Sequence, residues 1–347
     1  MKKAYKILPV YTGDVSGFAS ALYELGGMLV IHDPSGCNST YNTHDEVRWY
    51  KQEALIYISG LNDIDAITGN DDKFINDIVR ACEDMKPKFI ALANSPLPYL
   101  NGTDFKGISR IVEDKTGVPC FYVQTNAMHD YTKGASEAFL AFAKKMLKPA
   151  DKKIEGGINI LGSTPLDHVK TEFLIPEGKT VVSNWAYKTS LEDVLKAPQA
   201  ELNLVVSSTG LAVAEYMKKE FGIPYELMGS YLDAKRERTR NYIVGEPLIS
   251  GYIASEIKKK YGTDFNVIAT TEITDGLLSE CDRKCHGEDE IREALSDAET
   301  IIGDPMFELI SPKTAKFIRL PHFAMSGRLY RKEIPDLMRL EDYYNEP

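Results

Sequence analysis

Short apolar runs alternate with helix-like segments along almost the whole chain, and this rhythm limits the possible folds more than any other feature. Each run is at most six residues long, and turn residues usually follow it. Strands that alternate with helices in this way form parallel sheets whose crossover helices cover both faces. The predicted strands are 28–31, 54–58, 89–93, 119–123, 157–162, 180–182, 202–206, 266–269, 300–304 and 317–321. The predicted helices include 15–26, 72–86, 104–115, 134–147, 247–261, 288–296 and 305–315.

A polar stretch that contains Pro149 interrupts this rhythm, which starts again at Gly157. With 347 residues, the chain is also too long for one ordinary hydrophobic core. We therefore predict an α/β protein with three Rossmann-like, doubly wound parallel-sheet domains. Their expected limits are residues 1–148, 149–244 and 245–347.

The charge balance excludes several classes of function. The chain has 41 Lys and Arg against 51 Asp and Glu, a formal net charge of −10, which argues against nucleic acid or an anionic membrane as a partner. No apolar run approaches the ~20 residues needed to span a bilayer, and the basic start is not followed by the apolar segment of a signal peptide. Five cysteines are an odd number and form no disulfide framework, so we expect a cytoplasmic protein.

Cys37 follows the first predicted strand in a position that favours chemistry. The strand 28–31 stops at Asp33-Pro34-Ser35-Gly36, where Pro34 removes a backbone donor and Gly36 can adopt positive φ. This places Cys37 near the carboxyl end of a strand, where open α/β sheets bind their ligands. The alternative is that Cys37 is a small buried hydrophobe, as many single cysteines are.

Several motifs, in order, resemble the component 1 proteins of nitrogenase and nitrogenase-like reductases, and most of all their compact members. Residues 31–37 resemble the family's His-Gly-Pro-x-Gly-Cys turn, and residues 65–73 resemble its Asp-x-x-x-Gly-Gly-x-x-Lys segment. Further similar stretches are 117–119, 134–138, 158–162 and 301–305, so the resemblance covers nearly the whole chain.

The resemblance implies a specific arrangement. Two such subunits pair, and cysteines at their interface hold an iron–sulfur cluster, expected here to be [4Fe–4S]. An ATP-hydrolysing iron–sulfur reductase docks over the cluster and delivers electrons, and reduction takes place in a central cleft between the three domains. Cys37 matches one cluster ligand of the family, so it is the expected metal ligand.

The chain departs from the family at two other cysteine positions. The earlier cysteine would fall near residues 11–14 and the later one near 94–95, and neither segment contains a thiol. Self-pairing would supply two Cys37 thiolates, fewer than the four that such a cluster normally takes. Asp14, Asp33 or His32 would then complete the ligand set, or a cysteine-richer paralogue would supply the rest in a heterodimer. A third alternative is that no cluster binds.

Four further sets of residues are candidates for function. His129 follows a strand and is a candidate proton donor, because histidine titrates near neutral pH; a structural role is the alternative. Arg236 and Arg238 lie in the densest basic run and suit an anionic substrate, unless they form a solvated face. His322 follows a strand and is a third substrate candidate. Cys281 and Cys285 would share one face of a helix, but they lack the second pair that a structural zinc site needs.

The chain is therefore expected to be an oxidoreductase subunit that reduces a small molecule or cofactor with electrons from the iron–sulfur reductase. It has no Gly-x4-Gly-Lys-Ser/Thr loop, so it is not expected to hydrolyse ATP itself. Two alternatives stay open: a non-catalytic scaffold for metallocofactor assembly, and a cluster-free binding protein on the same fold.

Overall fold

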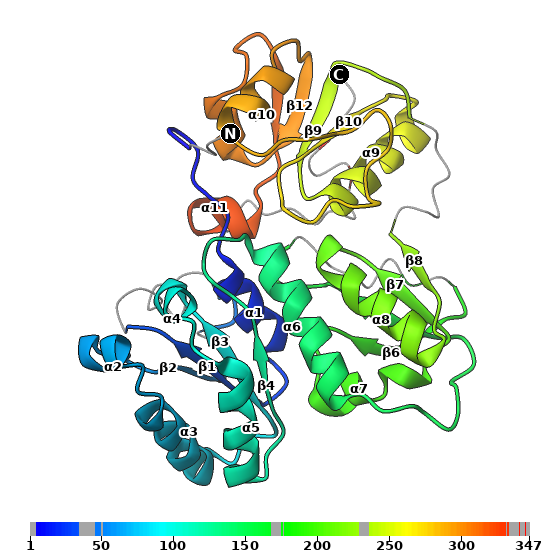
Figure 1. Cartoon of the computed structure of the whole chain (residues 1–347). Helices are drawn as coiled ribbons and strands as arrows, with labels where there is room; N and C mark the ends of the chain where they lie inside the picture. The colour runs from blue at the N-terminus through cyan, green and yellow to red at the C-terminus, as the bar shows by residue number, and fades with distance from the viewer. Residues whose placement is uncertain are drawn as a thin grey trace.

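Three separate parallel sheets organise the molecule (Figure 1). The computed structural model describes residues 5–34, 46–49, 51–167, 175, 177–228, 236–330, 332, 340 and 344. Every strand pair in the three sheets is parallel. The predicted fold class, α/β with three Rossmann-like domains, is confirmed.

The first sheet has the strand order β2-β1-β3-β4. Its strands are β1 (Met28–His32), β2 (Leu55–Ile58), β3 (Ile90–Asn94) and β4 (Cys120–Val123). Helices α1 (Asp14–Leu22) and α6 (Tyr131–Met146) cover one face, while α3 (Asp72–Met85) and α5 (Phe105–Thr116) cover the other. Two short helices, α2 (Asp63–Thr68) and α4 (Pro96–Asn101), follow β2 and β3 at the carboxyl end of the sheet.

The second sheet repeats this topology with the order β6-β5-β7-β8. Its strands are β5 (Gly157–Leu161), β6 (Thr180–Asn184), β7 (Leu202–Val205) and β8 (Tyr225–Leu227). Its helical elements are α7 (Leu191–Leu195), α8 (Leu211–Phe221) and the 3₁₀ turns η3 (Ala197–Gln199) and η4 (Ser208–Gly210).

The third sheet has the order β11-β10-β9-β12-β13, in which the chain winds outward in both directions from β9. Its strands are β9 (Asn241–Gly245), β10 (Asn266–Ala269), β11 (Arg283–Lys284), β12 (Thr300–Gly303) and β13 (Lys316–Arg319). The helical elements are α9 (Pro247–Tyr261), α10 (Glu288–Ala294), the 3₁₀ turn η5 (Pro305–Leu309) and α11 (Phe323–Tyr330).

The pairing of β9 bears on the second domain boundary, which the sequence predicts after residue 244. Strand β9 pairs with β10 and β12, so a boundary after residue 244 would cut through the third sheet. We therefore propose that the second domain ends before Asn241. The first boundary, near residue 148, falls between α6 and β5.

Two glycines bring α1 and α6 into close contact. A Cβ added to Gly17 would overlap the Tyr131 carbonyl oxygen, and one added to Gly134 would overlap the Asp14 carbonyl oxygen. Only glycine permits such a close approach of two backbones. Helix α6 also packs on the second domain, where the rings of Phe139 and Phe142 lie 5.6 and 5.9 Å from Trp185. One hydrophobic cluster consequently runs through all three domains.

Some expected elements differ from those observed. The helix predicted at 305–315 is only the 3₁₀ turn η5, because Pro305 opens it and the chain turns again before β13. Cys82 and Cys120 are buried in the core, as predicted.

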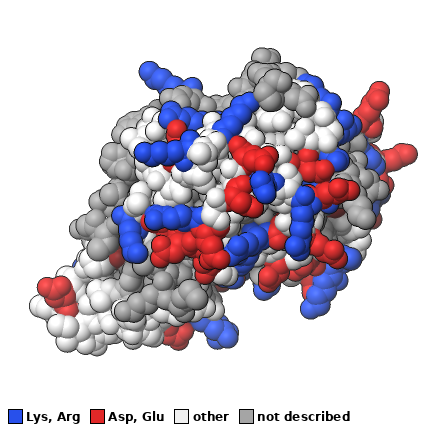
Figure 2. Space-filling model, turned by 90° about the horizontal axis from the view of Figure 1, so that it is seen from above, with Lys and Arg blue, Asp and Glu red and all other residues white. Residues whose placement is uncertain are grey.

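Among the described residues on the face seen from above, acidic and basic side chains are interspersed (Figure 2). Within the described ranges, no helix has the length and apolar character to cross a bilayer.

Candidate functional site

The carboxyl ends of the second and third sheets carry acidic and hydroxyl side chains at their topological switch points. In the second sheet, Asp167 follows β5 and Ser207 follows β7, the two strands between which the winding direction reverses. In the third sheet, Glu246 follows β9 and Asp304 follows β12 in the same relation. Ligands of doubly wound sheets bind in the crevices at such points.

Asp167 is the centre of a buried polar network. Its Oδ2 accepts hydrogen bonds from Ser207 Oγ at 2.8 Å and Thr164 Oγ1 at 3.1 Å, while its Oδ1 accepts one from the Tyr131 hydroxyl at 2.5 Å. Tyr131 is the first residue of α6, so this contact joins the first domain to the second. The turn that presents Asp167 begins at Gly162, where φ is +95° and a Cβ would meet Ser207 O at 2.9 Å.

His322 brings the third domain into the same network. It follows β13, and its backbone N–H donates to Asp304 Oδ2 at 2.8 Å, which fixes the start of α11. Its Nε2 lies 3.3 Å from the Tyr131 hydroxyl and 3.4 Å from Asp167 Oδ1. The Tyr11 ring packs edge-on against the imidazole, with ring centroids 5.7 Å apart. We call Tyr11, Tyr131, Asp167, Ser207 and His322 the junction cluster, because it joins all three domains.

Two buried carboxylates hold the loops around the junction cluster. Glu246 caps α9 by accepting a bond from Ile249 N at 2.7 Å, and it accepts another from Ser208 N of the second domain at 2.9 Å. Burial, reinforced by the nearby Asp167 charge, raises the pKa of Glu246 to about 7. Asp304 accepts bonds from His322 N and from Ser326 Oγ, and burial raises its pKa too.

The junction cluster brings three buried side chains, Tyr131, Asp167 and His322, within reach of one another. Burial, followed by the Asp167 charge, raises the pKa of Tyr131 well above its usual value, so its hydroxyl keeps its proton and donates to Asp167. The imidazole of His322 is within reach of both groups, and all three side chains are nearly inaccessible to solvent. Hydrogen-bonded Tyr, Asp and His are the side chains that general acid–base chemistry uses.

The predicted cluster ligands Cys37, Asp14, Asp33 and His32 have different surroundings at the end of the first sheet, as far as the structure describes them. Cys37 lies outside the described residues. The Asp14 carboxylate accepts hydrogen bonds from Asn126 N and Ala127 N, at 2.9 and 2.8 Å, and so fixes the loop after β4. Burial raises the pKa of Asp14 in spite of these bonds. Asp33 is buried at the carboxyl end of β1.

His32 faces the hydrophobic side of the first sheet. Its ring stacks on Phe74 with centroids 4.0 Å apart, and its Nδ1 lies 2.8 Å from Ser59 Oγ. Burial, helped by the Lys73 charge, lowers the pKa of His32 to about 4, so the ring is neutral near pH 7. These contacts occupy the face and one nitrogen of the ring. Among the described residues, no group of three or more His, Cys, Asp and Glu side chains is arranged to hold a metal ion.

The other candidates do not meet at one place. His129 is exposed and pairs with Glu272 of the third domain at 2.7 Å. Arg236 forms a buried bidentate ion pair with Asp282, at 2.8 and 2.7 Å. The Asp282 carboxylate thus neutralises the guanidinium without an anionic substrate. Arg238 is exposed.

Cys281 and Cys285 do not share a helical face, contrary to the helical interpretation of their spacing. Cys281 lies in a turn, and Cys285 follows β11 and is buried in the core of the third domain. Burial raises the pKa of the Cys285 thiol to about 11, so it is not a reactive thiolate.

Of the predicted site residues, His322 alone belongs to the junction cluster, and sequence reasoning missed its other members. A usable signal was present for Asp167 and Ser207, which lie in the segments that follow two strands, as the neighbouring Glu246 and Asp304 do. Glu246-Pro247 and Asp304-Pro305 also have the pattern of a helix cap followed by proline at the first helical position.

Comparisons with known proteins agree with this architecture. The chain is 25% identical over 261 residues to the nitrogenase iron-molybdenum cofactor biosynthesis protein NifE of Clostridium pasteurianum, a match that covers 72% of this chain and 55% of NifE. The chain thus spans little more than half the length of that relative. Its fold matches a chain of nitrogenase Cp1 at pH 6.5 with a TM-score of 0.69 and 15% identity, over 99% of this chain and 93% of that one.

A second structure, nitrogenase Cp1 at pH 5, matches with a TM-score of 0.62 and 15% identity, over 97% of this chain and 80% of that one. Residues 24–236 match the family described as nitrogenase component 1 type oxidoreductase, and this match covers more than half of the chain. With three doubly wound domains and that match, the chain belongs to the nitrogenase component 1 type oxidoreductase family.

Proposed function

We propose that this chain is the component 1 subunit of a nitrogenase-like reductase. It accepts electrons from an ATP-hydrolysing iron–sulfur reductase and reduces a small molecule or cofactor bound where the three domains meet. The junction cluster carries this proposal, because a reduction that consumes protons needs donors beside the bound molecule. His322 has that role in the proposal, and Tyr131 and Asp167 orient its imidazole.

The electron entry site of the proposal is the carboxyl end of the first sheet. An iron–sulfur cluster bound there would supply one-electron chemistry. Cys37 would be its ligand, with Asp33 as the auxiliary ligand nearest in sequence, whereas the contacts of Asp14 and His32 favour structural roles. One thiol per chain is too few for a [4Fe–4S] cluster, so a second subunit must contribute ligands.

An exposed apolar surface beside Asp33 supports this pairing. It lies on α2 and α4, which touch where Asn101 Nδ2 donates to Ala66 O at 2.9 Å. Both helices follow strands at the end of the sheet where Asp33 lies. The pairing patch consists of Ile64, Ile67, Leu97, Tyr99 and Leu100, of which Ile67 is 85% and Leu100 74% exposed. Apolar patches of this kind mark protein interfaces, and we propose a second copy of this chain as the occupant.

Metal analysis tests the cluster. Anaerobically purified protein should contain about two irons per chain, with matching acid-labile sulfide, for one [4Fe–4S] cluster shared by two copies. Cys37→Ala should lose this iron, whereas Cys82→Ala, which alters a core thiol of the same domain, should retain it. Iron near zero in the wild-type dimer would refute a cluster held by two copies of this chain.

Sedimentation velocity tests the pairing patch. We expect a dimer for the wild-type chain and a monomer for Ile67→Asp, because the substitution places a charge in the interface. Leu309→Asp is the matched control, since Leu309 is also exposed, at 59%, but lies in the third domain. A dimer that survives both Ile67→Asp and Leu100→Asp would show that the subunits pair through another surface.

Scaffolding of a metallocofactor is a second candidate function, favoured by the similarity to NifE, a cofactor biosynthesis protein. The two functions differ in electron flow. A reductase subunit should oxidise a reduced nitrogenase-type iron protein in a reaction that requires MgATP, and the Cys37→Ala variant should not. A chain that accepts no electrons, but passes a bound cofactor unchanged to an acceptor protein, would be a scaffold.

A further inference from the structure

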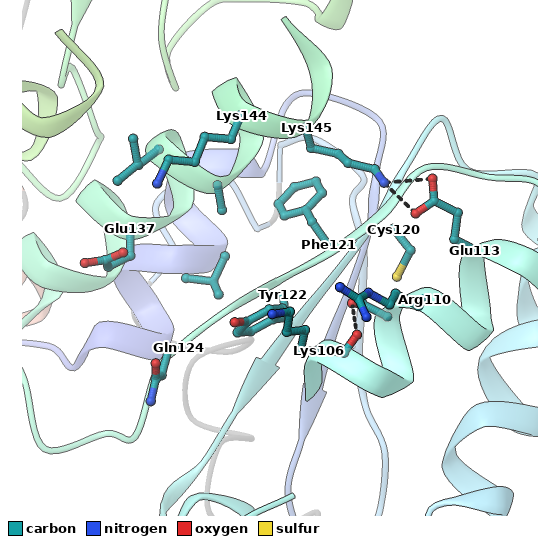
Figure 3. A pocket seen from close by; sticks show the side chains of 14 residues that line it. Lys106, Arg110, Glu113, Cys120, Phe121, Tyr122, Gln124, Glu137, Lys144 and Lys145 are labelled. Atoms are coloured by element: carbon teal, nitrogen blue, oxygen red, sulfur yellow. Dashed lines mark hydrogen bonds and ion pairs between the residues drawn. The ribbon is translucent and has the colours of Figure 1, made fainter. Parts of the chain in front are cut away.

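The first sheet has an open edge at β4, whose groove includes no residue of the junction cluster or the pairing patch. Strand β4 pairs only with β3 among the described strands, and a groove of about 430 Å³ runs along its other side. Figure 3 shows the groove from close by. Helix α5 forms one wall with Lys106, Arg110 and Glu113, and α6 forms the other with Glu137, Lys144 and Lys145; residues 120–124 lie between them.

Backbone groups of β4 face this groove. Ile90 N donates to Pro119 O at 2.8 Å, and Cys120 is the register partner of Ile90. In a parallel ladder, alternate residues of a strand bond to one neighbour, so the N–H and C=O groups of Cys120 and Tyr122 point away from β3. An edge that exposes such groups is a template for another strand. The Tyr122 side chain, 37% exposed, forms part of the groove floor.

The groove carries an excess of positive charge. Both of its acidic residues are already paired: Glu113 with Lys145 across the groove at 2.7 Å, and Glu137 with Lys133 at 2.8 Å. Among the described residues, no carboxylate forms an ion pair with Lys106, Arg110 or Lys144. Three cations therefore line the groove in a protein whose net charge is −10.

We propose that β4 is a docking site for an extended acidic segment of a partner protein, which adds to the first sheet as a further strand. The partner's backbone bonds to Cys120 and Tyr122, and its carboxylates pair with Lys106, Arg110 and Lys144. Strand addition obtains its affinity from main-chain hydrogen bonds and its specificity from side chains on either side. A small anion would use the cations and leave the backbone groups of β4 without a role, so the edge favours a peptide.

A synthetic peptide tests the site without knowledge of the natural partner. The probe is a fluorescein-labelled heptapeptide of sequence Glu-Asp-Val-Ile-Glu-Asp-Val, which as a strand presents carboxylates on both faces. Its binding to the whole chain is followed by fluorescence anisotropy at low ionic strength. We expect micromolar affinity and slower hydrogen exchange of the backbone around Tyr122 in the complex. Arg110→Glu and Lys144→Glu should each weaken binding about tenfold. Lys219→Glu, an exposed change on α8, should leave it unchanged.

Two further probes separate strand addition from simple charge attraction. The same peptide N-methylated at alternate residues keeps its charges but cannot form the ladder, and it should bind at least tenfold more weakly. Inorganic phosphate should compete only through ionic strength. Equal affinity for the methylated and unmethylated peptides, or unchanged hydrogen exchange at 119–124, would overturn the proposal in favour of an anion site. Absence of binding would overturn it outright.

Discussion

At the scale of single residues, Arg48 illustrates how buried charge joins two domains. Its guanidinium bonds to Glu46 Oε1 at 2.6 Å, to Glu24 Oε1 at 2.9 Å and to the Ala186 carbonyl of the second domain at 2.6 Å. The Arg48 side chain is 7% exposed, and the two carboxylates are 0% and 5% exposed. These carboxylates raise the pKa of Arg48 against the opposing effect of burial. The first domain supplies all three charges, and the second supplies a carbonyl oxygen that accepts one of the guanidinium hydrogen bonds.

Arg48→Met should therefore destabilise the protein by roughly 3–5 kcal/mol, because it leaves two buried carboxylates without their cation. Urea unfolding followed by circular dichroism measures the loss. The control is Arg319→Met, which removes an exposed ion pair with Glu308 and should change the free energy of unfolding by less than about 1 kcal/mol. Similar losses in the two variants would contradict this account.

At the scale of elements, helix α6 has three neighbours at once. It crosses α1 at Gly134, packs on Trp185 of the second domain, and carries Tyr131 into the junction cluster. Its Asp130 cap also accepts a bond from Glu272 N of the third domain at 2.7 Å. The position of α6 consequently fixes where the junction hydroxyl lies.

Gly134→Ala should destabilise the protein by roughly 3 kcal/mol, since the new methyl group would overlap the backbone of α1 and force the helices apart. Gly251→Ala is a matched control within α9, where an added Cβ meets nothing within 4 Å. There the change should stabilise by about 0.5–1 kcal/mol through helix propensity. Thermal unfolding of both variants checks the contrast, which fails if Gly134→Ala is neutral.

At the scale of the whole molecule, Glu246 makes the attachment of the third domain dependent on pH. Its pKa is raised from 4.5 to about 7, so the folded protein holds this proton more tightly than the unfolded chain does. The stabilisation from this proton is complete below about pH 4.5 and is lost as the pH rises through about 7.

Wild-type stability should therefore fall between pH 5 and pH 8 by roughly 2 kcal/mol more than that of Glu246→Gln, which cannot ionise. Urea unfolding at the two pH values gives the difference, and any constant effect of the substitution cancels. Equal pH dependence in the two proteins would show that Glu246 titrates normally.

Much of the fold could be predicted from sequence because its signals are local. The amphipathic spacing at 72–86 and the helix at 247–261 match α3 and α9 almost to the residue. The sequence does not predict some elements of two to eight residues, such as α2, α4, β8, β11 and α11. Segments this short contain too few residues to show a clear periodicity of apolar positions. The place of β9 in the third sheet depends on its pairing with β10 and β12, which no local pattern in the sequence indicates.

The candidate site was harder to predict. His322 was identified from its position after a strand, but its partners Tyr131 and Asp167 are 191 and 155 positions earlier in the chain. Only the packing of three domains brings them together. Arg236 shows the opposite error, because a basic run indicates charge but not the Asp282 carboxylate that neutralises it.

The division of the hydrophobic core has a consequence for synthesis on the ribosome. The cluster between the first sheet and helices α3 and α5 uses only residues from Met28 to Cys120, so it can close while the rest of the chain is still being made. The cluster that joins the domains begins at Val15 and includes Leu340 and Tyr344. It cannot be completed until residue 344 has been synthesised. Half of the first domain is thus able to fold early, whereas the cluster that joins the domains waits for residues that lie more than 200 positions later in the chain.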